Sequence, residues 1–332
     1  MTLSFRDAVL AQPQNLLDAG AAMRDALAQT DVEAISSGTL VLSGIGASGH
    51  ALVPAVRTLR AAGRRAFAIS SAELRSERAA RLGDAFVLVS QSGASAETVE
   101  ALERLDGAPV VAISAHGDSP LARAATAWLP LGSMSDTPVA TLSYTATLQA
   151  LGMLTEAVVG RFDGAAWERL PEIAADVLER CDATAEALAR DFEDVTALDA
   201  VGGGPAAASA GETALLAREA LRLPGTGMET REYLHGPLEA VDYGFGCVLF
   251  GGERERELAG ELASHDAQVA LLTDEPGDDV PGVTVFELER VGELAAPILQ
   301  IMPVQLLVDH LAGLRGLTIG SLRRPQRDTK VT

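Results

Sequence analysis

Short apolar runs that alternate with amphipathic stretches are the feature that most constrains the fold of this chain. The first run, TLVLSGIG at 39–46, ends in glycine and leads into the amphipathic stretch ASGHALVPAVRTLRAAG at 47–63. Four more apolar runs follow, with helical segments between them, at 64–70, 84–90, 108–114 and 125–131. Strands that alternate with helices are typical of βαβ units and predict a parallel sheet.

The same pattern then starts again. A long helical stretch from 142 to 192 is followed by a strand, a glycine-rich turn and a helix within 195–223. Later apolar runs and a closing helix lie at 246–252, 267–273, 282–288 and 296–316. We therefore predict an α/β protein with two similar doubly wound domains, each a parallel sheet flanked by helices.

The pattern also suggests domain boundaries. No low-complexity linker separates the two halves, so we expect the two domains to pack closely. The predicted segments are a helical arm at 1–35, a first domain at 36–160, a helical linker at 161–194, a second domain at 195–316 and a C-terminal tail at 317–332.

Composition narrows the possible partners and compartments. The net charge of −20 disfavours nucleic acid and anionic membranes as partners, although a locally positive pocket can still bind a small anion. We find no apolar run of about 18 residues to span a membrane and no signal-peptide pattern, so we expect a cytoplasmic protein. Cys181 and Cys247 are too few for a disulfide framework. No set of His, Cys and Asp has metal-ligand spacing, so we expect no metal and no cofactor.

The glycine-rich turn GIGASG at 44–49 matches the G-x-G-x-x-G pattern of dinucleotide-binding folds. In such folds an acidic residue about 20 residues later, at the end of the next strand, binds the ribose. Here that strand ends in AISSAE, and Glu73 comes late. A role in binding NAD is therefore a minor alternative.

Hydroxyl side chains follow two of the predicted strands and suggest a different ligand. The segment FVLVSQSGASAETVEAL places Ser90, Gln91, Ser92 and Ser95 in a turn that enters a helix, and Ser48 follows the first strand. The carboxyl ends of parallel strands share one edge of a sheet, so these groups can converge on one anion. Helix capping could explain one serine. Four hydroxyls and a glutamine on two adjacent turns predict a phosphate-binding site.

These motifs resemble those of the SIS family of phosphosugar-binding domains, and most closely the isomerase half of glucosamine-6-phosphate synthase. The resemblance covers nearly the whole chain, and its most specific parts are the serine loop and the segment HGP with an upstream glutamate. The motifs that carry it are VLAQP, GASGHA, SQSGASAET, PVATLSYTATLQAL, LLAREALR, REYLHGPLEAV and RPQRDTKVT.

The resemblance implies two tandem SIS domains of flavodoxin-like topology and a sugar-phosphate site. It implies a substrate pocket that Val139 and Thr141 also line. In the synthase the histidine of HGP enters the site from a neighbouring subunit, so the resemblance implies a homodimer with a shared active site and His235 donated across the interface. The implied phosphate-binding residues are Ser48, Ser90, Gln91, Ser92 and Ser95.

Two departures from the synthase pattern matter for function. The synthase begins with a glutaminase domain whose N-terminal cysteine attacks glutamine, whereas residue 2 here is Thr2, so we expect this chain not to draw ammonia from glutamine by itself. The synthase also has a lysine one helical turn before its catalytic glutamate, where this chain has Leu216. A proton relay of the synthase reaction is therefore missing.

Three residues are candidates for catalysis. Lys330 is the only lysine among 26 basic residues, and an amine can form an imine with a ketose while guanidinium cannot. Glu219 could move a proton between C1 and C2 of a sugar, and His235 could transfer the proton that opens the ring. The alternatives are a surface lysine on a frayed tail, a solvated helix glutamate and a structural histidine in a loop.

We therefore expect an enzyme that acts on a sugar 6-phosphate by aldose–ketose isomerisation coupled to amine release. It would be an amino-sugar-phosphate deaminase or a fructosamine-phosphate deglycase. A non-catalytic phosphosugar sensor is the main alternative, and an NAD-dependent oxidoreductase is the less favoured one. The sequence leaves the sugar epimer, the leaving amine and the direction of reaction open.

Overall fold

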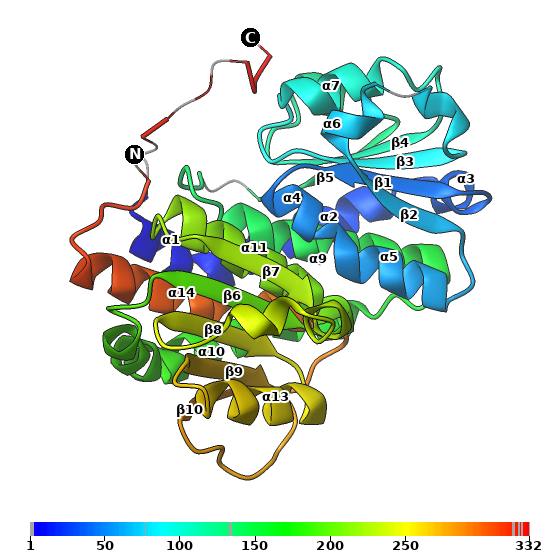
Figure 1. The fold of residues 1–332 in the computed structure, drawn as a ribbon. Helices are drawn as coiled ribbons and strands as arrows, with labels where there is room; N and C mark the ends of the chain where they lie inside the picture. Colours follow the sequence, from blue (N-terminus) through cyan, green and yellow to red (C-terminus); the bar gives the residue numbers. More distant parts are fainter. Residues whose placement is uncertain are drawn as a thin grey trace. The chain divides into compact units, whose positions relative to one another are not determined.

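The structure is a computed structural model that describes residues 3–76, 78–132, 135–320, 323–324, 326 and 328–331. By packing, the chain divides into two compact units, each built on one parallel sheet (Figure 1). The first-sheet unit comprises residues 13–135, 142–171 and 323–332. The second-sheet unit comprises residues 1–12, 136–141 and 172–322.

The first sheet has five parallel strands, and every one falls inside an apolar run predicted from the sequence. Its strand order is β2-β1-β3-β4-β5, the flavodoxin-like order. In register, Leu42 of β1 lies beside Ala68 of β2 and Val87 of β3. The strands are β1 (Leu40–Gly44), β2 (Ala66–Ser70), β3 (Ala85–Val89), β4 (Val110–Ser114) and β5 (Ala127–Pro130).

Helices cover both faces of this sheet (Figure 1). Alternate strand side chains point to opposite faces, and Val41, Phe86 and Leu88 pack with residues of α6, α7 and α8 in one core cluster. On the other face, α5 packs against β1, β2 and α9. The helices of this unit are α2 (Gln12–Leu27), α3 (Val32–Ser36), α4 (Ala47–His50), α5 (Leu52–Ala61), α6 (Ser71–Leu74), η1 (Ala79–Arg81), α7 (Ala96–Leu102), α8 (Pro120–Ala124) and α9 (Leu142–Val159).

The second sheet repeats this topology. Its order is β10-β9-β8-β6-β7, which becomes the order of the first sheet when its strands are numbered from β6. Both sheets therefore have the doubly wound α/β architecture that the sequence predicted. The strands are β6 (Ala197–Gly202), β7 (Gly225–Glu229), β8 (Phe245–Phe250), β9 (Gln268–Thr273) and β10 (Val283–Glu287).

The helices of the second-sheet unit also lie on both faces of its sheet (Figure 1). Residues of α12 and α13 join β6, β8 and β9 in one core cluster, and α11 packs on β6, β7 and α14. The helices are α1 (Phe5–Leu10), α10 (Gly164–Asp191, of which residues 172–191 belong to this unit), η2 (Gly204–Ala206), α11 (Ala207–Glu219), α12 (Thr230–Tyr233), η3 (Pro237–Ala240), α13 (Glu253–Ala263) and α14 (Ala296–Leu314).

Strand β7 is the one strand that the apolar pattern missed. Its sequence, GTGME, contains no apolar run. The strand lies at the edge of the sheet and packs against α11. A Cβ atom on Gly225 would lie 2.7 Å from the carbonyl oxygen of Ala214, and one on Gly227 would lie 2.6 Å from that of Ala210. The two glycines therefore permit a close approach of strand and helix. In the sequence alone, a segment with two glycines resembles a loop.

Helix α14 corrects the expectation that no segment is apolar enough to cross a membrane. Among the described residues, this 19-residue helix alone meets the length and hydropathy of a membrane span. However, 72% of its apolar window is buried inside the protein, and the helix packs against α1 and α11. A buried apolar helix of this kind is what the core of a doubly wound domain requires.

Candidate functional site

The loops after β1 and β3 lie together at the carboxyl edge of the first sheet. Ser43 of β1 pairs with Leu88 of β3, so the two strands end side by side. The helices that follow them, α5 and α7, pack on different faces of the sheet. A crevice at such a switch point is where doubly wound sheets bind ligands.

The hydroxyls of the serine loop, residues 90–95, converge on one another. Ser90 Oγ donates a hydrogen bond to Ser95 Oγ at 2.9 Å, and the backbone N–H of Ser95 donates to Ser90 Oγ at 3.4 Å. The N–H of Ala94 donates to Ser92 Oγ at 3.3 Å. Ser95 is the N-cap residue of α7, yet its hydroxyl makes no capping hydrogen bond. Helix capping therefore does not account for the Ser95 side chain.

Ser48 and Gln91 occupy the two neighbouring turns as predicted, with one difference. Ser48 is half-buried and lies within the short helix α4 instead of the turn before it. Its backbone approaches β1 so closely that a Cβ atom on Gly44 would lie 2.9 Å from it. The carbonyl of Gln91 accepts a hydrogen bond from the N–H of Ala115 at 2.8 Å, which attaches the serine loop to the end of β4.

Gly93 gives the serine loop its shape, and this leads to a prediction. Its φ is +64°, and a Cβ atom there would lie 2.1 Å from Ser119 Oγ. Gly107 has a similar φ of +79° but open space around it. Gly107→Ala should therefore lower the free energy of unfolding by about 1 kcal/mol through backbone strain alone. Gly93→Ala should lower it by roughly 1–3 kcal/mol more because it also displaces Ser119. Urea unfolding measures both, and equal losses would contradict the tight packing at Gly93.

The C-terminal tail contributes an amine to the serine loop. Lys330 Nζ donates to Ser92 Oγ at 2.8 Å and to Ser95 Oγ at 3.3 Å. Backbone contacts hold the tail there: Ser95 and Lys330 form an antiparallel bridge, and Ala96 N–H donates to the carbonyl of Thr329 at 3.1 Å. Residues 321, 322, 325, 327 and 332 of the predicted tail lie outside the described residues.

The environment of Lys330 changes the acidity of its amine. The residue is exposed overall, but partial desolvation lowers the pKa of the ammonium group below its ordinary value, while the nearby carboxylate of Glu97 acts in the opposite direction. A lower pKa increases the fraction of neutral amine at a given pH, and only the neutral amine can attack a carbonyl carbon.

The other two catalytic candidates lie in the second-sheet unit. Glu219 is the last residue of α11, and its side chain is exposed. His235 follows α12, is also exposed, and its backbone N–H donates to the carbonyl of Glu232 at 3.1 Å. Leu216, which replaces the lysine of the synthase pattern, is only 1% exposed. A lysine at that position would have to bury its charge, so leucine suits the core of this unit.

The predicted pocket residues Val139 and Thr141 are both fully buried and belong by packing to the second-sheet unit. The N–H of Thr141 donates to Asp136 Oδ2 at 3.0 Å, and its hydroxyl donates to Asp136 Oδ1. The carbonyl of Val139 accepts a hydrogen bond from the Thr137 hydroxyl. Asp136, which the sequence analysis did not identify, therefore fixes the conformation of this segment.

The sequence analysis also missed a row of buried hydroxyls that links Ser43, Ser71 and Thr98. Ser43 Oγ lies 2.9 Å from Ser71 Oγ, and the hydroxyl of Thr98 donates to Ser71 Oγ at 3.2 Å. These residues join β1, the strand before the first glycine-rich turn, to α6 and to α7, the helix after the serine loop. The available signal was the serine within the apolar run VLSG, because a polar residue in a buried strand needs a hydrogen-bond partner.

A cavity of about 290 Å³ lies on the β1–β2 side of the first glycine-rich turn. In a dinucleotide-binding protein this side would hold the ribose, bound by a carboxylate at the end of β2. Here β2 ends at Ser70, whose hydroxyl instead caps α6 by accepting from the N–H of Ala72. The cavity is lined by Gly44, Ile45, Gly46, Gly49, His50, Leu52, Ala68, Ile69 and Ser70.

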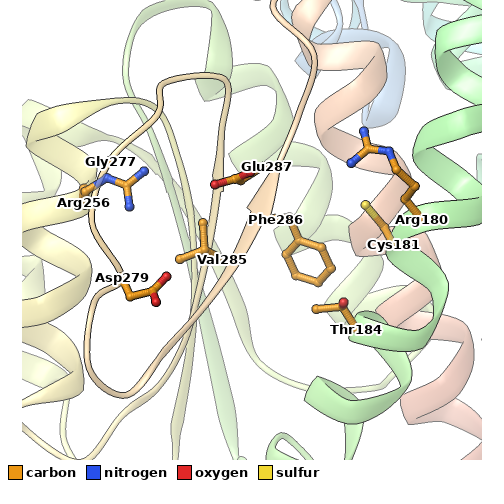
Figure 2. Close-up of a pocket in the computed structure, with 9 residues that line it drawn as sticks. All are labelled: Arg180, Cys181, Thr184, Arg256, Gly277, Asp279, Val285, Phe286 and Glu287. Carbon is orange, nitrogen blue, oxygen red and sulfur yellow. The ribbon is translucent and has the colours of Figure 1, made fainter.

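A second cavity, of about 260 Å³, lies in the second-sheet unit beside β10 (Figure 2). It contains none of the predicted site residues. Its two guanidinium groups already have partners: Arg256 donates to the carbonyls of Asp278 and Glu275, and Arg180 pairs with Asp176 at 2.6 Å. Within the described ranges, no group of three His, Cys, Asp or Glu side chains could hold a metal ion.

Comparison with known proteins agrees with the doubly wound fold. Residues 34–157 match the model of the SIS domain. The chain is 29% identical over 267 residues to the glutamine–fructose-6-phosphate aminotransferase (isomerizing) of Bartonella quintana, and 28% identical over 256 residues to that of Thermotoga maritima. These matches cover 74% and 71% of this chain but 44% and 42% of the relatives. The chain thus spans less than half the length of the curated relatives that it matches.

Solved structures show the same fold over nearly the whole chain. The C-terminal domain of glucosamine-fructose-6-phosphate aminotransferase from Francisella tularensis has a TM-score of 0.83 at 20% identity, covering 96% of this chain and 98% of that one. Tagatose-6-phosphate ketose/aldose isomerase from Escherichia coli has a TM-score of 0.79 at 17% identity, covering 97% of each chain.

A glucosamine-6-phosphate deaminase from Thermotoga maritima has a TM-score of 0.71 at 19% identity, covering 92% of this chain and 95% of that one. Residues 34–157 of the chain are thus similar to a SIS domain, and nearly the whole chain shares the fold of the C-terminal domain of a glucosamine-fructose-6-phosphate aminotransferase.

Proposed function

We propose that this protein binds a sugar 6-phosphate and catalyses an aldose–ketose isomerisation that is coupled to the release of an amine. The observation that carries the proposal is the position of the chain's only lysine: its amine lies on the hydroxyls of the serine loop, 2.8 Å from Ser92 Oγ. The serine loop, to which we assign the phosphate, therefore contacts the amine to which we assign attack on a carbonyl carbon. The similarity to phosphosugar isomerases supports the substrate class.

The serine loop and Ser48 would hold the phosphate. Hydroxyl and backbone N–H groups donate short, charge-assisted hydrogen bonds to phosphate oxygens. The protein as a whole has a charge of −20, so an anionic substrate needs such a local cluster of donors to overcome the general repulsion. The amine of Lys330, already beside Ser92 and Ser95, would add a positive charge while it stays protonated.

Glu219 and His235 would carry out the proton transfers. In the isomerisation, a carboxylate removes the proton from one of C1 and C2 and returns it to the other. The proton on the hydroxyl or amine of the first carbon passes to the carbonyl oxygen of the second, so the double bond moves through an enediol or enaminol and the atoms balance. Glu219 is assigned the transfer between C1 and C2. His235 is assigned the transfer of a proton between the ring oxygen and the anomeric hydroxyl, which opens the sugar ring.

Amine release would follow from the isomerisation. Shifting the double bond places an imine at the carbon that bears the substrate nitrogen. Neutral Lys330 attacks this carbon, the substrate amine leaves with a proton, and water then hydrolyses the lysine imine to a carbonyl group. The same steps serve a deaminase that releases ammonia and a deglycase that releases a larger amine.

Turnover of a substrate panel tests this proposal directly. Hexosamine 6-phosphates and fructosamine 6-phosphates should be incubated with the protein, and the released ammonia or amine measured. We expect release from at least one of them, with NAD neither required nor reduced, because β2 carries no ribose-binding carboxylate at its end. Tight binding of sugar phosphates without turnover of any compound would instead support a non-catalytic sensor.

A homodimer with a shared site, located in the cytoplasm, belongs to the same proposal and gives a second prediction. The exposed His235 of one subunit would complete the site of the other. His235→Ala and Glu219→Gln variants should each be inactive, but their heterodimers would regain one intact site. An equal mixture with free subunit exchange should therefore recover about a quarter of the wild-type activity. Mixtures that exchange subunits, as shown by mass spectrometry, yet stay inactive would contradict the shared site.

A further inference from the structure

Asp199 and Tyr233 form a buried polar pair in the core of the second-sheet unit. Asp199 lies in the middle of β6 and is 8% exposed, and Tyr233, the last residue of α12, is fully buried. The tyrosine hydroxyl donates to Asp199 Oδ2 at 3.0 Å. A carboxylate inside a buried strand costs free energy unless hydrogen bonds satisfy it. An apolar pair would suit the core equally well, so this pair needs a reason beyond packing.

The first residue of α12 is held in a similar way. The hydroxyl of Thr230 donates to Glu255 Oε1 at 2.6 Å, and both residues are buried. Glu255 Oε2 also accepts from the N–H of Gly252 at 3.1 Å, so this carboxylate is itself fixed. A helix of four residues is not stable by itself. Polar contacts at its first and last residues therefore anchor α12 to α13 and to β6.

Helix α12 leads directly to His235. The N–H of Leu234 donates to the carbonyl of Thr230, and that of His235 to the carbonyl of Glu232, both at 3.1 Å, so the helical turn continues up to the histidine. Gly236 then has a φ of +133°, outside the helical region, and the helical turn ends there. Tyr233 is the nearest buried side chain before the exposed His235. The hydrogen bond from Tyr233 to Asp199 therefore helps to fix the position of the histidine backbone.

We propose that Asp199 and Tyr233 are positioning residues for His235, holding α12 against β6 so that the imidazole is presented in one place. This inference rests on the proposed function, in which His235 transfers a proton during ring opening. A displacement of about 1 Å at such a group is enough to lower a rate by about 100-fold. The hydrogen bond between Tyr233 and Asp199, two residues before His235, limits such a displacement.

The acidities of the pair fit a lasting hydrogen bond. Burial, together with the neighbouring carboxylate and thiol, raises the pKa of Tyr233 far above its ordinary value, so its hydroxyl remains a donor at every working pH. Burial also raises the pKa of Asp199, while hydrogen bonds from Tyr233 and Thr226 oppose this. The neighbouring Cys247 thiol, with its pKa raised to about 12 by burial, also stays protonated.

The test separates positioning from stability. Tyr233→Phe removes the donor, and the double variant Asp199→Leu/Tyr233→Phe removes both polar groups, which should restore thermal stability relative to the single variant. We expect both to lower kcat about tenfold with KM changed by less than about twofold. Asp199→Asn keeps an acceptor for the tyrosine and should retain kcat within about twofold. Ser209→Ala, which removes a buried hydroxyl bonded to Gln300 in the same unit, is the control and should keep wild-type kcat.

Two results would overturn the inference. One is a double variant that is folded and has wild-type kcat. The other is hydrogen exchange at residues 230–236 that is unchanged in Tyr233→Phe, where we expect at least about tenfold faster exchange than in the wild type. The exchange measurement needs no substrate. If the wild-type protein turns over no phosphosugar, the proposed function fails, while the exchange rates still decide whether the pair anchors α12.

Discussion

Replacing Glu219 by glutamine is expected to lower kcat by at least about 100-fold, the smallest contribution usual for a positioned general base. Glutamine keeps the size and hydrogen-bonding capacity of the side chain but cannot accept the proton that moves between C1 and C2. We assign Glu219 to the proton transfer and the serine loop to phosphate binding. The affinity for a sugar 6-phosphate should therefore change little.

Calorimetry and steady-state kinetics on the same preparation measure these two quantities. Glu186→Gln is the matched control, because Glu186 is an exposed glutamate on α10 that forms an i,i+4 ion pair with Arg190. That variant should keep wild-type kcat. Undiminished turnover by the Glu219→Gln protein would show that Glu219 is only a solvated glutamate on the helix surface. The proposed general base would then be wrong.

Lys330→Arg is expected to have a comparable effect on turnover, a loss of at least about 100-fold, because guanidinium keeps the charge but offers no neutral lone pair for imine formation. Phosphate binding should survive, since Ser92, Ser95 and a cationic side chain all remain. Burial lowers the pKa of the Lys330 amine, so imine formation should increase with pH through that lowered pKa, starting below the range of an ordinary lysine.

Borohydride trapping identifies the reacting amine without ambiguity, because the chain contains one lysine. With a ketose phosphate present, the reduced adduct should appear on the C-terminal peptide that contains Lys330, and the Lys330→Arg protein should lack it. An adduct found only at the N-terminal amine, or a fully active Lys330→Arg protein, would show that the contact with Ser92 and Ser95 is a tail interaction without chemistry.

The sequence predicted those parts of the fold that depend on local patterns. Apolar runs of the sequence became strands in both sheets, and the serine loop lies at the predicted edge. Strand β7 was missed because its two glycines are required by the close contact with α11. A requirement that comes from tertiary contact produces no hydrophobic periodicity in the sequence.

The candidate site was predictable only in part for a related reason. The residue types at Ser90–Ser95 and at Lys330 could be recognised from their chemistry, and the structure shows their mutual contact. Asp136, Asp199 and Glu255 could not be recognised, because nothing in the neighbouring sequence indicates which buried donor each carboxylate will accept from. Long-range pairing of this kind is a property of the folded chain.

Binding of fructose 6-phosphate to the wild-type protein and to a Ser92→Ala/Ser95→Ala variant is the measurement that tests the central claim most directly. At 100 times its Kd, the ligand should stabilise the wild-type protein by about 2.7 kcal/mol, which raises the thermal midpoint by several degrees. The variant should show almost no shift, and NAD should shift neither protein. A midpoint raised by NAD but not by the sugar phosphate, or an equal sugar-phosphate shift in both proteins, would contradict the assignment of the serine loop as the phosphate site.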